Sequence, residues 1–333
     1  MDANLLLGIV SVLHLYALAA VYSLAELLVT IYDYFQGHDK TYYMKKVRSS
    51  GKYKKGKKIA LVTGGAGAIG RKIVEYLLDL EYEVYVMGHG VDDLRHLGVS
   101  EENICEVDMA DCIEVSRCLQ RWSKSMERVT LLFACHGVMA CGKDTSNYGI
   151  EKHMAVNFLS NVFLINTILQ KFGNSNCRMI FLSSATLHAA HLWDPQEFSS
   201  VDAFRRYRNG YHSYALSKYC LSRYIYLYSN HTDRTIDMVS VHPGIVPTAL
   251  YNNVNILWRF FIQSVLKHVL WTPSTAALKL IEAAHSDLIP GAYYEYGRAM
   301  DSSFRGKDDA NFMRSVQKIN SEVFAKLPEE RSK

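Results

Sequence analysis

Short apolar runs alternate with amphipathic stretches from residue 58 onward. The apolar runs are KIALVT, EVYVM, TLLFA, RMIFL and DMVSV, with NICEVDM as a weaker one. Stretches such as RKIVEYLLDL lie between them and repeat apolar residues at helical spacing. Buried parallel strands read as continuous apolar runs, and alternation of strands with helices is typical of βαβ units. The pattern therefore predicts an α/β fold built on a parallel sheet.

The C-terminal part of the chain continues this pattern. GAYYEYG, residues 291–297, reads as one more strand. After it, apolar residues at helical spacing predict a helix packed on the body, and a proline ends it. These residues are Phe312, Val316, Ile319, Val323 and Leu327, followed by Pro328.

The N-terminal part has a different pattern. Residues 5–25 form a 21-residue run with no charged residue. As a helix this run spans about 30 Å, the thickness of a bilayer core, which predicts a membrane anchor in contact with lipid. A cleaved signal peptide is the alternative, because Ala17-Leu18-Ala19 resembles a cleavage site. No Lys or Arg precedes the run, however, and the run is longer than a typical signal core.

Charge is concentrated beside this run. Residues 1–58 hold nine Lys and Arg against four acids, so that a net charge of +4 divides into +5 here and −1 elsewhere. This local excess excludes a nucleic-acid surface and places the body in the cytosol by the positive-inside rule. The lysines either contact anionic lipid headgroups or form a solvated linker. We expect an anchor at 1–32, a basic linker at 33–57, a catalytic domain at 58–300 and a helical tail at 301–333.

The seven cysteines show no C-x-x-C pair and no Cys/His spacing typical of metal sites. This pattern fits a reduced compartment, so no disulfide and no metal are predicted.

A glycine-rich loop, TGGAGAIG at residues 63–70, follows the first apolar run and precedes a helical pattern. Gly65, Gly67 and Gly70 match the G-x-G-x-x-G dinucleotide fingerprint, in which small residues let the backbone approach a pyrophosphate at a helix N-terminus. An ordinary strand–helix turn is the alternative. The second strand ends in Gly88-His89-Gly90 without a carboxylate, so NAD and NADP both stay open, and His89 is either a cofactor contact or an exposed loop residue.

A Tyr-x-x-x-Lys pair occurs four times, and its position distinguishes the four. Only Tyr214 and Lys218 begin a long helical segment between the fifth and sixth strands. Their spacing puts both side chains on one helix face, where the ammonium favours the phenolate of a group with an ordinary pKa near 10. Ser184, at the end of RMIFLSS, is suited to donate a hydrogen bond to a reacting oxygen.

Taken in order, these motifs resemble the short-chain dehydrogenase/reductase superfamily over residues 58–300. The resemblance implies a single Rossmann-like, doubly wound parallel sheet with helices on both faces, preceded by the transmembrane helix. TGGAGAIG, CEVDMAD, KHMAVNFLSNVF, FLSSATLH, SYALSK and HPGIVPT carry it. It implies Tyr214, Lys218, Ser184 and Asn157 as catalytic residues. It also implies cofactor contacts at Gly64, Gly65, Gly67, Ile69, Gly70, Asp108, Gly137, Tyr214, Lys218, Pro243 and Thr248.

Within that superfamily the chain is similar to the membrane-anchored retinol dehydrogenase branch and to a related branch that acts on polyprenols. The anchor, SSATLH, WTPSTAA and GAYYEYG carry this similarity. It implies hydride transfer between NAD or NADP and a lipophilic alcohol or carbonyl, such as a retinoid, steroid or polyprenoid. It also implies the endoplasmic reticulum membrane, with the catalytic domain facing the cytosol.

The sequence departs from the family pattern at two places. Ala68 replaces the middle glycine of the loop, which then also fits the Thr-Gly-x-x-Gly-x-x-Gly pattern of epimerase-type members. Ala134-Cys135-His136-Gly137 replaces Asn-Asn-Ala-Gly after the fourth strand. A catalytically weak binding or scaffold protein is therefore an alternative function. An epimerase would need a large sugar-nucleotide domain, of which the sequence shows little sign.

The segment NILWRFFIQSVLKHVLW is expected to cover the substrate with an apolar helical side. A core helix or a homodimer helix is the alternative. The apolar positions are Ile256, Leu257, Phe260, Phe261, Val265, Leu266, Val269 and Leu270.

Overall fold

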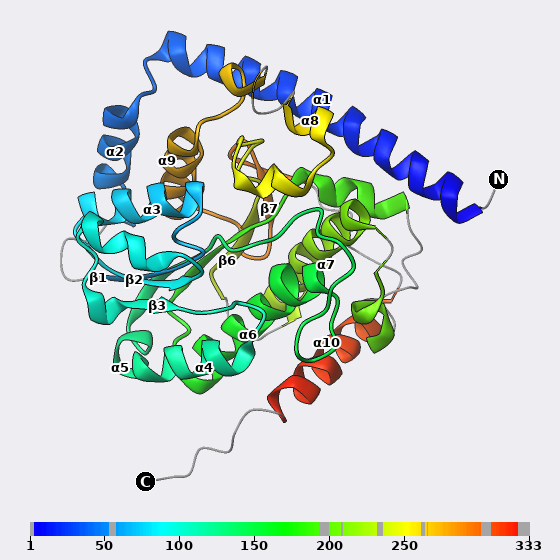
Figure 1. Ribbon diagram of the computed structural model, residues 1–333. Coiled ribbons are helices and arrows are strands. Elements are labelled where there is room, and N and C mark those ends of the chain that lie inside the picture. Colours follow the sequence, from blue (N-terminus) through cyan, green and yellow to red (C-terminus); the bar gives the residue numbers. More distant parts are fainter. Residues whose placement is uncertain are drawn as a thin grey trace.

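The computed structural model describes residues 3–52, 58–192, 200–207, 209–231, 236–260, 264, 266–300 and 308–325. In this part of the chain, eight strands form one sheet in the order β3-β2-β1-β4-β5-β6-β7-β8 (Figure 1). All neighbouring strands are parallel except β7 and β8. The strands are β1 (Lys58–Thr63), β2 (Tyr82–Gly88), β3 (Ile104–Glu106), β4 (Val129–Ala134), β5 (Arg178–Leu182), β6 (Met238–Val241), β7 (Tyr293–Glu295) and β8 (Arg298–Met300).

Helices cover both faces of the sheet, which confirms the predicted doubly wound α/β architecture (Figure 1). One hydrophobic core lies between the sheet and α4, α6, α7 and α10, and the other lies between the sheet and α2, α3 and α9. The described helices are α1 (Ala3–Gln36), α2 (Lys40–Ser49), α3 (Ala68–Asp79), α4 (Cys112–Arg121), α5 (Ser123–Met126), α6 (Ser160–Asn166), α7 (Gly210–His231), α8 (Ile256–Phe260), α9 (Pro273–Ala284) and α10 (Asp309–Phe324).

The strand order reverses direction between β1 and β4. From β1 the chain moves outward to β2 and β3, then returns to β4 and continues to β5 and β6. In open α/β sheets, ligands bind at the carboxyl ends of the strands near such a reversal. The loops after β1, β4, β5 and β6 therefore define where the site is expected.

Helix α1 is longer than the predicted anchor and lies along the body (Figure 1). Among the residues that the structure describes, Tyr16–Gln36 is the stretch long and apolar enough to cross a membrane, with a mean hydropathy of 1.3. The side chains of residues 5–9, 11, 12 and 15 of the predicted span lie outside the description. The segment expected to be a linker contains α2, whose Tyr43, Met44 and Val47 are buried in the core beside α3 and α9.

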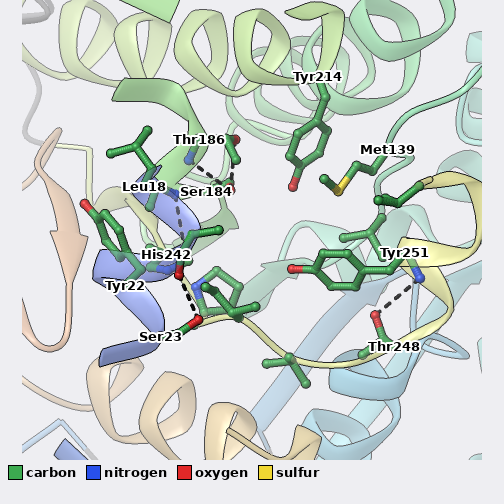
Figure 2. Close-up of a pocket in the computed structure, with 18 of the residues that line it drawn as sticks. Leu18, Tyr22, Ser23, Met139, Ser184, Thr186, Tyr214, His242, Thr248 and Tyr251 are labelled. Carbon is green, nitrogen blue, oxygen red and sulfur yellow. Dashed lines mark hydrogen bonds between the residues drawn. The ribbon is translucent and has the colours of Figure 1, made fainter. Parts of the chain in front are cut away.

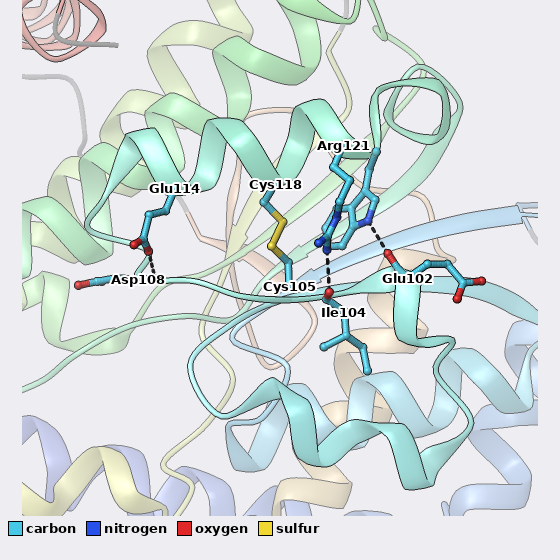
Figure 3. Close-up of a disulfide and its surroundings, with 8 residues drawn as sticks. Glu102, Ile104, Cys105, Asp108, Glu114, Cys118 and Arg121 are labelled. Carbon is cyan, nitrogen blue, oxygen red and sulfur yellow. Dashed lines mark hydrogen bonds between the residues drawn. A yellow bond between two sulfur atoms is a disulfide. The ribbon is translucent and has the colours of Figure 1, made fainter. Parts of the chain in front are cut away.

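The expectation of no disulfide is wrong. Cys105 on β3 and Cys118 on α4 form a disulfide, with a Cα–Cα distance of 6.4 Å (Figure 3). Spacing rules missed the pair because strand and helix meet only through tertiary packing. Disulfides are rare in reducing compartments, so the cysteines no longer support a cytosolic location of the catalytic domain. The remaining support for that location is the excess of basic residues around α2.

The C-terminal helix confirms the predicted periodicity over its described residues. Phe312, Val316, Ile319 and Val323 of α10 are buried, whereas Leu327 and Pro328 lie outside the described residues. Arg223 of α7 holds the start of this helix: its guanidinium lies 2.7 Å from the carboxylate of Asp309 and 4.6 Å from the ring centre of Phe312.

In the described part of the segment predicted to be an apolar cover, helix α8 spans Ile256–Phe260 and a 3-10 turn spans Leu266–His268. Ile256 and Phe260 are exposed and Leu270 is buried, so the described residues do not share one buried face. Phe261 and Val265 lie outside the described residues, as does the side chain of Leu257.

Candidate active site

The glycine loop between β1 and α3 is held tightly against the end of β4. Gly64 has a φ of +65°, and a Cβ added there would lie 2.7 Å from the backbone of His136. A Cβ on Gly70 would collide with the carbonyl oxygen of Gly64. Only glycine permits this conformation and these close approaches. Gly67 caps α3, and among the described residues no side-chain hydrogen bond caps this helix end. The helix N-terminus is therefore available for an anion.

A cavity of about 370 Å³ lies over this helix end. The loops after β1, β4, β5 and β6 all contribute to its wall, as expected for the carboxyl edge of the sheet. Its chemistry fits a dinucleotide, because glycines and backbone N–H groups lie at one end and a lysine at the other. From the expected cofactor contacts, the wall includes Gly67, Ile69, Gly70, Gly137, Tyr214, Lys218, Pro243 and Thr248.

Three of the expected cofactor contacts do not line this cavity. Gly64 and Gly65 lie behind it, packed against His136 and Val86 respectively, so they shape the loop. Asp108 is exposed after β3, where its carboxylate accepts a 2.9 Å bond from the N–H of Ala110. Ala68, in contrast, is the first residue of α3 and lines the cavity.

Glu106 contacts the loop after β2, and sequence reasoning did not single it out. It ends β3, and its carboxylate accepts hydrogen bonds from the backbone N–H groups of Gly90 at 2.8 Å and Val91 at 3.0 Å. It also lies 3.4 Å from His89, whose other ring nitrogen is 3.7 Å from Asp108. The sequence carried no signal for this position, because Glu106 lies in the middle of the predicted strand NICEVDM and only the observed β3 ends there. The loop after β2 therefore has two carboxylates beside it.

His136 connects the glycine loop to the central helix. Its Nδ1 lies 2.6 Å from the hydroxyl of Thr63 on β1, and its Nε2 lies 2.7 Å from the hydroxyl of Ser160 on α6. Because Ser160 donates its own proton to the carbonyl of Val156, it accepts from Nε2, and Nδ1 accepts from Thr63. Burial lowers the pKa of His136 to about 3, so the ring is neutral. His136 thus provides a polar link between strand and helix at the altered Ala-Cys-His-Gly position.

Asn157 occupies a π-helical turn, Met154–Leu159, directly before α6. Its amide accepts from the N–H of Val138 at 2.8 Å and donates to the carbonyl of Val138 and the hydroxyl of Ser217, each at 2.9 Å. Its freed backbone carbonyl accepts from the amide of Asn161 at 2.9 Å. Wide turns of this kind occur often at functional sites because they aim a side chain or carbonyl out of the helical pattern. Asn157 joins the loop after β4 to α7.

Tyr214, Lys218 and Ser184 come together at the ends of α7 and β5. The Lys218 ammonium donates a 2.7 Å bond to the carbonyl of Leu182 and lies 5.9 Å from the ring centre of Tyr214. Ser184 accepts hydrogen bonds from the backbone and hydroxyl of Thr186, at 3.3 and 3.0 Å. Figure 2 shows Tyr214 and Ser184 directed into one cavity.

Burial has the largest effect on the pKa values of Tyr214 and Lys218. It raises the pKa of Tyr214 to about 12, against a lowering effect of the Ser184 hydroxyl. It also lowers the pKa of Lys218 to about 8. Near pH 7 the buried lysine is thus still mostly protonated, while the phenol is neutral. A positive charge beside Tyr214 is available at physiological pH.

A second cavity, of about 350 Å³, opens in front of Tyr214 and Ser184 (Figure 2). Met139 and Tyr251 line it and were not singled out from the sequence, whereas Leu266, also in its wall, belongs to the predicted apolar cover. Burial raises the pKa of Tyr251 above its ordinary value, so its phenol is neutral. Part of the wall comes from α1. Tyr214, Ile69, Pro243 and Thr248 line both cavities, which therefore meet at the predicted catalytic tyrosine.

Comparison with known proteins agrees with this geometry. Residues 58–192 match the short chain dehydrogenase family. The chain carries a short chain dehydrogenase family domain. Polyprenol dehydrogenase of Danio rerio is 27% identical over 264 residues, which cover 74% of this chain and 80% of that protein. Retinol dehydrogenase 11 of Mus musculus is 25% identical, over 68% of this chain and 77% of that protein.

Solved structures agree at the level of the fold. A short chain dehydrogenase/reductase from Saccharomyces cerevisiae superposes with a TM-score of 0.54 at 20% identity, over 77% of this chain and 99% of that one. A 4-hydroxyisoleucine dehydrogenase complexed with NADH and succinate gives a TM-score of 0.54 at 16% identity, over 72% and 96%. These likenesses to solved structures show a shared fold, and the family match places residues 58–192 within it.

Proposed function

We propose that this protein is an NAD(P)-dependent dehydrogenase or reductase of lipophilic alcohols and carbonyls, with Tyr214 as its acid–base residue. One observation carries the proposal: Tyr214 stands where a glycine-lined cavity meets a largely apolar one. The first suits a dinucleotide and the second a hydrophobic substrate. The names of the relatives, polyprenol and retinol dehydrogenases, support the same substrate class.

Each residue has a distinct part in the proposed reaction. A bound nicotinamide would accept or donate the hydride and, when oxidised, add a positive charge near the phenol. In oxidation the Tyr214 phenolate takes the hydroxyl proton, and in reduction the phenol returns one. Protonated Lys218 favours the phenolate, Ser184 donates a hydrogen bond to the substrate oxygen, and Asn157 holds the loop after β4 in place.

We infer that NAD(H) is preferred over NADP(H). The loop after β2 is where such folds read the 2′ position of the adenosine ribose. Glu106 and Asp108 flank His89 of that loop, and their charges oppose a 2′-phosphate. Glu106 also fixes the loop backbone through Gly90 and Val91, so the negative charge stays in position.

We further propose that the protein acts at the endoplasmic reticulum membrane with its catalytic domain in the cytosol. Helix α1 is long and apolar enough to cross a membrane, and the basic residues around α2 follow it. Selective permeabilisation of cells, with antibodies against tags at either end, tests the orientation. Staining of a C-terminal tag only after the organelle membrane is opened would contradict it.

Turnover by the detergent-solubilised full chain tests the function. We expect reduction of NAD⁺ with geranylgeraniol or all-trans-retinol, and a loss of about 10²- to 10⁴-fold in kcat for Tyr214→Phe with cofactor affinity retained. Tyr148→Phe is the matched control, since Tyr148 and Lys152 form another Tyr-x-x-x-Lys pair, which lies away from both cavities. Equal loss in both variants, or full activity of Tyr214→Phe, would contradict the assignment.

A further inference from the structure

Helix α1 forms one wall of the cavity in front of Tyr214 (Figure 2). Leu18, Tyr22 and Ser23 lie across that cavity from Tyr214 and Tyr251. A role as a membrane anchor alone does not account for these contacts with the cavity. The residues of α1 in the wall are Tyr16, Leu18, Ala19, Ala20, Tyr22 and Ser23.

Glu26 holds this helix on the body. It is completely buried, and its carboxylate accepts hydrogen bonds from the backbone N–H groups of Ile245 at 2.5 Å and Trp271 at 3.5 Å. Ile245 belongs to the loop after β6, whose Pro243 lines both cavities. Burying a carboxylate without hydrogen-bond partners costs free energy, so a shift of α1 that broke these bonds would be unfavourable. The two bonds therefore fix the rotation of α1 and its position along the loop.

A second polar contact lies one turn earlier on α1. The hydroxyl of Tyr22 donates a 2.7 Å hydrogen bond to Glu295 on β7. Glu295 is itself held by the hydroxyl of Tyr293 at 2.7 Å and by the ring of His188 at 2.9 Å. Two points of attachment, one turn apart, therefore orient the pocket side of α1.

The opposite side of the same helix is apolar and exposed. Val21, Leu24 and Leu28 are 64%, 59% and 60% exposed. Ile256 and Phe260 of α8 are also exposed. Exposed apolar surface of this kind marks contact with lipid or protein, and the membrane-compatible length of α1 favours lipid. Helix α1 thus lines the cavity with one side and exposes an apolar surface suited to lipid on the other.

We propose that α1 is a substrate-binding element that selects alcohols with a long apolar chain. The reacting hydroxyl lies at Tyr214 and Ser184, and the apolar chain runs along the Leu18 side of α1 toward the membrane. Glu26 is a positioning residue, because its hydrogen bonds hold α1 against the body next to the cavity. The proposal deepens the proposed function and depends on it for the identity of the reacting group.

A matched pair of variants on α1 tests the proposal. Leu18 lines the cavity and Leu24 is exposed, so Leu18→Ala and Leu24→Ala make the same chemical change on the cavity-lining and on the exposed surface of one helix. The probes are geranylgeraniol and prenol, which share an allylic alcohol and differ in chain length. We expect the ratio of kcat/KM for geranylgeraniol over prenol to fall about tenfold in Leu18→Ala and to keep its wild-type value in Leu24→Ala. Equal ratios in the two variants would overturn the proposal.

Photolabelling separates this proposal from the proposed function. A geranylgeraniol analogue with a diazirine on its chain is irradiated with the full chain in detergent, and the labelled peptides are mapped. Label within residues 16–23 supports the proposal even if the wild-type protein oxidises neither alcohol, a result that would reject the proposed function alone. Label confined to other segments overturns the proposal whatever the turnover.

Discussion

The neutrality of buried His136 predicts a specific loss of stability in acid. The ring is 7% exposed and is held by Thr63 and Ser160, in an arrangement that uses one ring nitrogen as donor and the other as acceptor. Its pKa falls from 6.5 to about 3 on burial. Between these values the unfolded chain binds a proton that the folded chain does not. Stability supplied by neutral His136 is therefore complete above about pH 6.5 and decreases as the pH falls toward 3.

The size of the effect follows from the two pKa values. Between about pH 7 and pH 5, the unfolded histidine takes up most of one proton while the folded one takes up almost none. Integration over this interval gives a loss of about 2 kcal/mol. The unfolding entropy is about 2.1 cal/mol/K per residue, and the chain has 333 residues. Dividing the free-energy loss by this total entropy gives a decrease in Tm of about 3 °C.

Scanning fluorimetry of the detergent-solubilised protein at the two pH values measures this loss. His136→Asn removes the titrating ring, so its Tm should fall about 3 °C less than the wild-type Tm over the same interval, even if the variant is less stable at neutral pH. His96→Asn, at an exposed position, is the control and should keep the wild-type response. If His136→Asn shows the full wild-type decrease, His136 is not the neutral buried group that the structure indicates.

Three other predictions test separate parts of the structure. Lys218→Met should lower kcat at neutral pH about 10²-fold, because the phenolate of Tyr214 loses its neighbouring charge, and full activity in steady-state assays would contradict that role. The kcat/KM of the wild-type protein should be at least about tenfold higher with NAD⁺ than with NADP⁺. Glu106→Gln should lower this NAD⁺-to-NADP⁺ ratio, and an unchanged ratio would show that Glu106 does not select the cofactor. Arg223→Met should expose α10 to limited proteolysis and lower Tm by about 2–6 °C, since it breaks the pair with Asp309, and protease resistance equal to wild type would refute this.

The sequence alone predicted much of the catalytic scaffold. Continuous apolar runs and helical spacing are local patterns, and they located β1 to β7, α3, α7 and α10, whereas the antiparallel strand β8 was not predicted. The loop TGGAGAIG and the helix that begins near Tyr214 were also identifiable, because glycine requirements and i,i+4 spacing depend on contiguous residues. The four catalytic candidates were named from motif order, and the structure places three of them, Tyr214, Lys218 and Ser184, at one end of α7 and β5.

Only the tertiary structure decided how distant segments meet. The Cys105–Cys118 pair, the Thr63–His136–Ser160 link and the seating of Glu26 against Ile245 each join residues that no local pattern relates. Composition marked α1 as apolar, but it could not show that one side of the helix closes a catalytic cavity. Periodicity specifies which side of a helix is apolar, whereas the surface that this side contacts depends on the packing of the whole chain.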